Sequence, residues 1–361
     1  MAKKLPEIST GTDRIYRRMI ASKAFLSGEL EALRLAATAQ GAPQWRILRY
    51  PHICNPEKLA YPIPTANYVR PEAFESHLKY LSTDCSVISL PKLVELIKSG
   101  EPIPERAAVI TLDCGYLDHF EIAAPLLKKY GLTATFFLPA AFIGTSNFFW
   151  QDKITVSMLI YKNLNLPIPP LSFLDENFYK EMRAIAPNGE VTPESIALLI
   201  RALERATPEE RLIAIHIIGH SIATGNDLPK QPCFMDWNHA RELEKTGFTI
   251  GSLGDANLYA DEMPITAIVD DLEKSKTTFK TAEVSAEILA FPEGRFSAAA
   301  VTEALRQGFQ TQCLLGALPP PRYAPNQPIL LGRVPMYQDA SFCVELFACR
   351  MYELVISGIA F

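Results

Sequence analysis

The sequence predicts an α/β fold built on parallel strands, and two neighbouring segments carry that prediction. Residues 108–112 form a short, uncharged and partly β-branched run, which is typical of a strand covered on both faces. After a turn at residues 114–116, apolar side chains recur at helical spacing over residues 120–127, and a second strand is predicted at residues 133–138. A strand, a helix and a second strand in this order favour a parallel sheet.

The remaining elements follow the same alternation along the chain. A helical period predicts an N-terminal helix over residues 13–39, with only Ser22 polar on its apolar face. Further strands are predicted at residues 45–50, 85–90 and 309–315, and further helices at residues 69–81, 298–307 and 342–355. From about residue 154 to residue 230 the strand pattern lapses, and two helices are predicted within residues 192–223. This stretch is interpreted as a helical insertion.

Composition narrows the class of partner. The chain has 361 residues, of which 48% are hydrophobic and 21% charged, and these values are typical of a soluble protein with a sizeable core. A formal net charge of -5 gives no basic surface for nucleic acid or an anionic membrane. We expect no nucleic-acid partner and a small molecule or neutral glycan instead.

Targeting and redox signals point to the cytoplasm. The N-terminus has basic residues without an apolar core of signal-peptide length, and no stretch approaches a membrane span. The seven cysteines are odd in number, scattered and without zinc-type spacing, so most are expected to be reduced core residues. We therefore expect a cytoplasmic protein with no membrane span.

The residues around Asp113 resemble a known signature. TLDCGY at residues 111–116 and PLLKKYGLTATFF at residues 125–137 resemble the T-F-D-D-G-Y motif and the following P-x-L-K-K-Y-G-x-x-A-T-F-F segment of polysaccharide deacetylases with the NodB-type domain. In that family the first Asp is the general base and the second is a ligand of the catalytic metal. The resemblance places Asp113 at the base position and Cys114 at a ligand position.

A later segment resembles the second signature of the same family. Residues 235–258 match a W-x-x-x-x-x-L helix, a Gly and a strand ending in I-G-S, which relatives follow with a His-x-x-x-His metal motif. The two histidine positions are Leu253 and Asn257 in this chain. Leu cannot coordinate a cation, and an Asn carbonyl is poorly matched to zinc. All three ligand positions implied by the resemblance are therefore replaced.

The third signature, P-Y-G after a strand, resembles FPEGR at residues 291–295. Pro292 and Gly294 match, Glu293 stands at the aromatic position, and Arg295 follows. The late histidine that acts as general acid in the family has no counterpart, because His239 is the last histidine of the chain.

The resemblance implies a distorted (β/α) barrel of seven or eight strands, as in the NodB-type deacetylases, with a helical insertion and an N-terminal helix. On this basis we expect an N-terminal helical extension over residues 1–43 and a barrel over residues 44–340 that includes the insertion at about 154–230. A C-terminal helix over residues 341–361 is expected to pack on the barrel.

The replaced ligand positions affect whether the site can activate water with a metal ion. A metal ion makes hydroxide available near neutral pH by lowering the pKa of bound water from about 15.7 towards about 7. Without its ligands we expect no cofactor, and a divalent ion such as zinc, cobalt or nickel only if the site has been rebuilt. Asp113 is the surviving base position, and the residues expected to line the groove are Cys114, Tyr116, Leu253, Asp255, Asn257, Pro292, Glu293 and Arg295.

Three functions remain open. In the first hypothesis, the chain is a deacetylase-like protein without N-deacetylase activity, which binds a glycan, an N-acetylated sugar or a protein partner of polysaccharide biosynthesis. Alternatively, it hydrolyses an amide bond of an N-acetylated sugar with a rebuilt site around Asp113 and Cys114, where the thiolate would be a ligand or a nucleophile. In the third hypothesis it is a scaffold with a vestigial groove.

Overall fold

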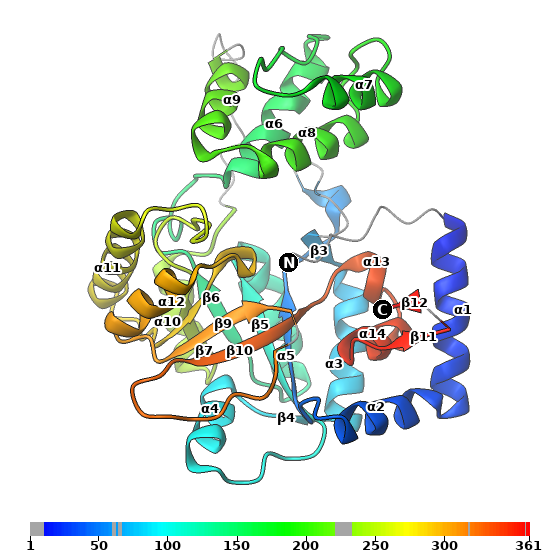
Figure 1. Ribbon diagram of the computed structural model, residues 1–361, viewed down its shortest axis with the longest axis vertical. Helices are drawn as coiled ribbons and strands as arrows, with labels where there is room; N and C mark the ends of the chain where they lie inside the picture. The colour runs from blue at the N-terminus through cyan, green and yellow to red at the C-terminus, as the bar shows by residue number, and fades with distance from the viewer. Residues whose placement is uncertain (1–10, 60–62, 64–66, 221–232, 317, 358) are drawn as a thin grey trace. The chain divides into compact units, whose positions relative to one another are not determined.

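The computed structural model describes residues 11–59, 63, 67–220, 233–316, 318–357 and 359–361 (Figure 1). The chain forms two compact units. The barrel unit consists of Met1–Cys54, Thr65–Gly144 and Phe234–Phe361, and the helical unit consists of Asn55–Pro64 and Thr145–Cys233. Within the described ranges, no helix has the length and apolar character needed to cross a membrane.

Seven parallel strands close into a barrel. Around the barrel they follow the order β1-β10-β9-β8-β7-β6-β5, and β5 pairs back with β1. The short strand β4 (Ser86–Val87) pairs with the first residues of β5. The closed parallel barrel confirms the predicted fold class. The seven strands are β1 Arg46–Tyr50, β5 Ala107–Asp113, β6 Thr135–Leu138, β7 Thr249–Ser252, β8 Ile288–Ala290, β9 Thr311–Leu315 and β10 Ile329–Pro335.

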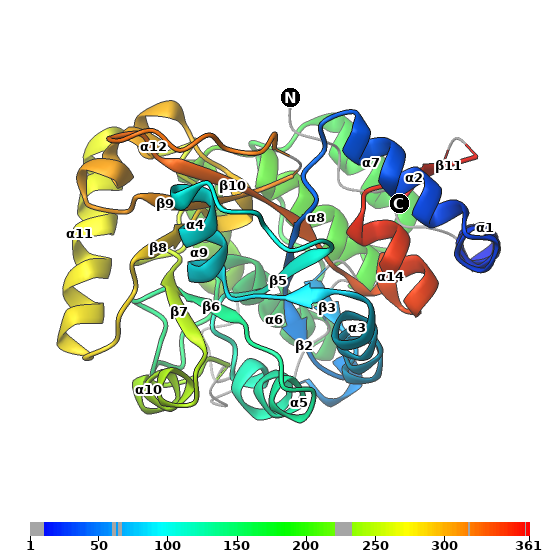
Figure 2. The ribbon, with the colours of Figure 1, turned by 90° about the horizontal axis from the view of Figure 1, so that it is seen from below.

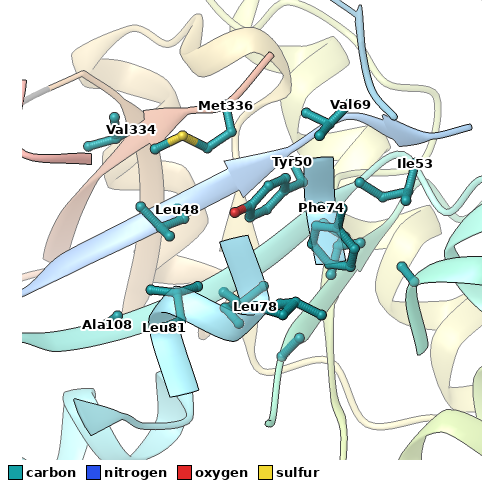
Figure 3. Close-up of a cluster of buried hydrophobic side chains, with 14 of the residues drawn as sticks. Leu48, Tyr50, Ile53, Val69, Phe74, Leu78, Leu81, Ala108, Val334 and Met336 are labelled. Carbon is teal, nitrogen blue, oxygen red and sulfur yellow. The ribbon is translucent and has the colours of Figure 1, made fainter. Parts of the chain in front are cut away.

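Helices cover the outside of the strands (Figure 2). They are α3 Pro71–Asp84, α4 Leu90–Ser99, α5 Ala124–Lys129, α10 Trp237–Lys245, α11 Ile265–Thr281 and α12 Ala298–Arg306. The contact between β1 and α3 shows how the core forms: Tyr50 meets Phe74 edge to face, with ring centroids 4.9 Å apart, and Leu78 lies beside them (Figure 3). Such aromatic burial is a major contribution to core stability.

Two short strand pairs complete the barrel unit. The strand β2 (His52–Ile53), which follows β1 directly in the chain, pairs in parallel with β3 (Tyr68–Val69). At the C-terminus, β11 (Val355–Ile356) and β12 (Ile359–Ala360) pair antiparallel.

Three predicted elements differ from the structure in more than a shift of a few residues at their ends. The single helix expected over residues 13–39 is divided into α1 (Gly11–Ser27) and α2 (Glu29–Ala39), because Gly28 has a φ of 77° between them. The strand expected at residues 85–90 is only β4, since the Ser89 side chain already caps α4 by accepting the Lys92 N–H. The last predicted helix is shorter than expected.

That C-terminal helix, α14, spans Val344–Met351 and follows α13 (Gln338–Ser341). The prediction extended it to residue 355, but Val355 belongs to β11. The helix α14 lies beside α1 and α3 (Figure 1), so the two ends of the barrel unit pack on each other.

The helical unit contains α6 (Trp150–Asn163), α7 (Glu176–Ile185), α8 (Pro193–Arg205) and α9 (Pro208–His220), with the short 3₁₀ turn η1 (Pro56–Lys58). The two helices predicted within residues 192–223 are α8 and α9. Thr192 begins α8 with a capping box to Ser195. Met158, Leu199 and Ile218 are buried in a separate core of this unit.

Candidate functional site

The strand β5 ends inside the barrel at Asp113, whose carboxylate is bound by two arginines. Arg333 of β10 donates from Nη1 to Oδ1 at 2.6 Å and from Nη2 to Oδ2 at 3.0 Å. Arg49 of β1 donates from Nε to Oδ2 at 3.0 Å. Burial alone would raise the pKa of Asp113, but the charges and hydrogen bonds of Arg333 and Arg49 outweigh it and lower the pKa. The carboxylate is thus a weaker base than an ordinary Asp.

The two arginines extend this contact into a four-residue network, which we call the arginine–carboxylate network: Arg333, Asp113, Arg49 and Glu293. Arg49 Nη2 donates to Glu293 Oε1 at 2.8 Å. Burial would lower the pKa of Arg49, but the charges of Glu293 and Asp113 outweigh it and raise the pKa. The Arg333 side chain is fully buried, with its guanidinium carbon 5.1 Å from the Phe137 ring centroid. Two positive and two negative charges make the network neutral.

The turn after Asp113 is tightly packed. Cys114 and Gly115 have φ angles of 81° and 63°, and a Cβ at residue 115 would lie 2.8 Å from side-chain atoms of Leu138, so this turn requires glycine. Cys114 and Tyr116 are both buried. The Tyr116 ring stacks on His52, with centroids 3.3 Å apart. These two groove residues therefore lie near Asp113 in packed surroundings.

The loop that follows β7 holds three of the predicted groove residues. Leu253 is buried, and Asn257 has a φ of 55°. The backbone N–H groups of Asp255 and Ala256 donate to the two carboxylate oxygens of Asp271 on α11, at 3.0 and 2.9 Å. Burial raises the pKa of Asp271, and the two backbone N–H groups oppose that rise. Asp271 therefore fixes the conformation of this loop.

Replacing Asp271 by Ala should lower the free energy of unfolding by about 1–3 kcal/mol, because two backbone N–H groups lose their acceptor. The neighbouring Asp270 is the matched control: its carboxylate is exposed and pairs with Lys274 at the surface, so Asp270→Ala should change stability by less than about 1 kcal/mol. Urea denaturation followed by circular dichroism measures both. Equal effects of the two substitutions would show that the loop does not depend on Asp271.

The predicted groove residues after β8, which are Pro292, Glu293 and Arg295, do not share one set of contacts. Pro292 is buried, and Glu293, with a φ of 47°, contacts Arg49. Arg295 pairs with Asp261 at 3.1 Å and with Glu262 at 2.5 Å. The structure thus brings Glu293 to Asp113 through Arg49, whereas the ion pairs of Arg295 are made with the loop before α11.

A second polar cluster lies between β2 and the π-helical turn η3 (His119–Ala123). His52 Nδ1 is 2.6 Å from Asp118 Oδ2, and the Ile53 N–H donates to Asp118 Oδ1 at 3.0 Å. Burial would raise the pKa of Asp118, but the His52 charge and these hydrogen bonds outweigh it and lower the pKa. Ligand atoms of His52, Cys54 and Asp118 all lie within 4.8 Å of one another. This group has the composition and spacing of a possible metal site.

The positions at which the resemblance implies metal ligands do not fit a metal. Leu253 offers no donor atom, and its side chain lines a small, mainly apolar cavity with Met263, Ile268 and Phe291. Asp113, the neighbour of Cys114, already has both oxygens bound by guanidinium groups. The two guanidinium groups already neutralise the carboxylates of Asp113 and Glu293, so this neutral network offers a cation no uncompensated negative charge. We therefore derive no metal-dependent step at these positions.

The sequence analysis did not identify Arg49, Arg333, Asp118 or Asp271. A signal for two of them is present in the sequence. Arg49 lies in the predicted strand at residues 45–50, and Arg333 lies among apolar residues in LGRVPMY, where no strand was predicted. An arginine among buried apolar residues requires a charged partner. The contacts of Asp118 and Asp271 depend on loop conformations that the sequence pattern does not define.

Comparison with known proteins gives local sequence matches. YxkH, a predicted polysaccharide deacetylase of Bacillus subtilis, is 34% identical over 82 residues, which cover 22% of this chain and 29% of YxkH. A poly-beta-1,6-N-acetyl-D-glucosamine N-deacetylase of Staphylococcus aureus is 35% identical over 91 residues, or 25% of this chain and 31% of the enzyme. The matches span less than a third of the length of these curated relatives. No protein-family model matches the chain.

Solved structures show the same fold over most of the chain. IcaB from Ammonifex degensii superposes with a TM-score of 0.51 and 14% identity, covering 84% of this chain and 96% of IcaB. A polysaccharide deacetylase from Bacillus cereus gives a TM-score of 0.51 and 14% identity, covering 85% of this chain and 68% of that protein. This chain is thus similar to polysaccharide deacetylases in local sequence and in its barrel fold.

Proposed function

We propose that this chain is a polysaccharide deacetylase-like protein that has lost metal-dependent N-deacetylation and binds an N-acetylated glycan in cell-envelope polysaccharide metabolism. The observation that carries the first part is the arginine–carboxylate network. Asp113, the position that the resemblance assigns to the general base, has both carboxylate oxygens occupied by Arg333 and Arg49. A base that must accept a proton from water needs a free oxygen within hydrogen-bond reach.

The missing metal ligands support the same proposal. Deacetylation requires an activated water, a Lewis acid on the carbonyl and an acid for the leaving amine. Leu253 and Asn257 stand where relatives have histidines, and the chain has no histidine after His239. Loss of the metal alone raises the activation free energy of deacetylation by several kcal/mol. In this proposal Asp113 serves the stability of the barrel.

The proposed ligand class follows from the relatives. One of them is named for poly-beta-1,6-N-acetyl-D-glucosamine, and a chain with a net charge of -5 is better suited to such a neutral glycan than to a polyanion. We therefore choose β-1,6-linked N-acetylglucosamine oligomers as the probe.

The purified chain should release no acetate from these oligomers, with or without added zinc, cobalt or nickel, while a matching S. aureus deacetylase releases acetate under the same conditions. Calorimetry should detect binding of the N-acetylated oligomer and weaker binding of the fully deacetylated oligomer of equal length. Acetate release above one equivalent per chain would overturn the loss of catalysis. Absence of binding to either oligomer would overturn the glycan assignment and favour a scaffold.

A further inference from the structure

We propose that His52, Cys54 and Asp118 form a binding site for a zinc-class divalent metal ion, on residues other than those that carry the metal in the resemblance to the deacetylases. His52 and Cys54 would supply a nitrogen and a thiolate ligand, and the Asp118 carboxylate would complete the site. The proposal goes beyond the proposed function, because it concerns metal binding alone and requires neither a glycan nor catalysis.

The chemistry of the three side chains favours a zinc-class ion. Zinc in proteins is bound by imidazole nitrogen, thiolate sulfur and carboxylate oxygen, whereas calcium and magnesium prefer oxygen ligands alone. Cys54 is a thiol and not half of a disulfide. A mixed set of nitrogen, sulfur and oxygen donors therefore selects against the hard cations.

The spacing of the three groups is compatible with a shared ion. One ligand atom from each lies within 4.8 Å of the other two. Bond lengths of about 2.0–2.3 Å in a tetrahedron place zinc ligands about 3.5 Å apart, so small side-chain movements would close the site. His52 and Cys54 are separated by one residue on an extended segment, which places them on the same face. Asp118 approaches from the turn that precedes η3.

The state of the His52 ring is the second, independent observation. His52 is only 5% exposed, and its Nε2 atom has no hydrogen-bond partner among the described residues. A buried polar atom without a partner is costly and requires an explanation. Asp118 Oδ2 lies 2.6 Å from the other ring nitrogen, Nδ1, so Asp118 serves as a ligand once it exchanges this contact for the ion. A metal ion would satisfy the unpartnered nitrogen.

Cobalt spectroscopy on the full chain tests the site. The protein is first stripped of metal with a chelator and then titrated with Co²⁺, because a thiolate ligand produces a near-ultraviolet charge-transfer band that oxygen and nitrogen ligands do not. We expect this band with one Co²⁺ per chain, and its loss when one equivalent of Zn²⁺ is added. Elemental analysis of the zinc-loaded protein should give one ion per chain.

Variants locate the ion. Cys54→Ser should abolish the band, and His52→Gln should weaken Co²⁺ binding by more than about 100-fold, since loss of an outer partner alone costs about 10–100-fold. Asp118→Asn should weaken it by at least about 10-fold. The matched control is Cys85→Ser. Cys85 follows α3 in the chain and is not one of the proposed ligands, so this variant should leave the band unchanged. Far-ultraviolet circular dichroism confirms that each variant is folded.

Two results would overturn the proposal. One is the absence of a band and of bound zinc in the stripped and reloaded wild-type chain. The other is a band that survives in His52→Gln and Asp118→Asn but disappears in Cys114→Ser, which would assign the metal to the turn after Asp113. The His52 and Asp118 variants keep the test decisive if Cys54→Ser does not fold. Metal binding without acetate release would support this site and leave the proposed function intact. Acetate release by a chain that binds no metal at this site would overturn the proposed loss of catalysis.

Discussion

Replacing Asp113 by Asn will lower the free energy of unfolding by about 3–5 kcal/mol, because it leaves the buried guanidinium of Arg333 without its neutralising carboxylate. The side chains of Arg333 and Asp113 are 0% and 1% exposed, so water cannot take the place of the missing charge. Urea denaturation at neutral pH, followed by circular dichroism, measures the loss. A substitution at a carboxylate that served only as a base would abolish hydrolysis and leave stability nearly unchanged.

The matched control for Asp113→Asn is Glu293→Gln in the same network. The Glu293 side chain is 48% exposed, and solvent screens its contact with Arg49, so the expected loss is less than about 1 kcal/mol. If the two variants lost similar amounts of unfolding free energy, burial would not determine how much each carboxylate contributes to stability. A wild-type-like Asp113→Asn would contradict the structural role of this carboxylate.

The difference in the free energy of unfolding between wild type and Asp113→Asn should depend on pH, which gives a further check on the role of Asp113. Its pKa in the folded chain is lowered, whereas an unfolded Asp titrates near about 3.9. The stabilisation from ionised Asp113 is therefore fully present above that unfolded value and is lost as the pH falls through the lower, folded value. The gap in stability between wild type and Asp113→Asn should be constant from neutral pH to about pH 5 and should narrow in stronger acid.

The parallel α/β fold could be predicted from the sequence pattern because strands such as β5 are buried on both faces, whereas the closed barrel was implied by the resemblance to the deacetylases. Every residue of β5 is buried, and such strands read as apolar runs that local pattern analysis detects. The wrong predictions concern the bounds of helices and strands, because a single residue can determine where such an element begins or ends. Gly28 breaks the N-terminal helix, and the Ser89 cap starts α4 before the predicted strand is complete.

The sequence predicted that Asp113 ends a strand and that Cys114 and Tyr116 follow in a turn, but it did not indicate the contacts of Asp113. The turn after β5 places Asp113, Cys114 and Tyr116 close together, as expected at the end of a strand in a parallel fold. The partners of Asp113 come from β1 and β10, which are 64 and 220 residues away in the chain. Closure of the barrel pairs β1 with β5, and β10 lies on the other side of β1. Local sequence patterns carry no information on pairing at that separation.

Replacing Arg333 by Met should also lower the free energy of unfolding by about 3–5 kcal/mol, because Asp113 then keeps a buried charge with Arg49 as its remaining cation. Met fills much of the volume of the arginine stem and can still contact the Phe137 ring, so the loss reports the charge and not a cavity. The measurement is the same urea denaturation at neutral pH, with Arg306→Met, a largely exposed arginine, as the control.

The double variant Asp113→Asn with Arg333→Met separates a coupled network from two independent losses. Once both charges are removed, neither leaves the other uncompensated, and Arg49 still has Glu293 as its partner at 2.8 Å. We expect the double variant to be more stable than the sum of the single losses predicts, by about 1–3 kcal/mol. Strict additivity would mean that Arg333 and Asp113 act separately, and then Asp113 would be available to other chemistry. A large coupling would instead mean that the base position of the deacetylases has become a structural ion pair in this barrel.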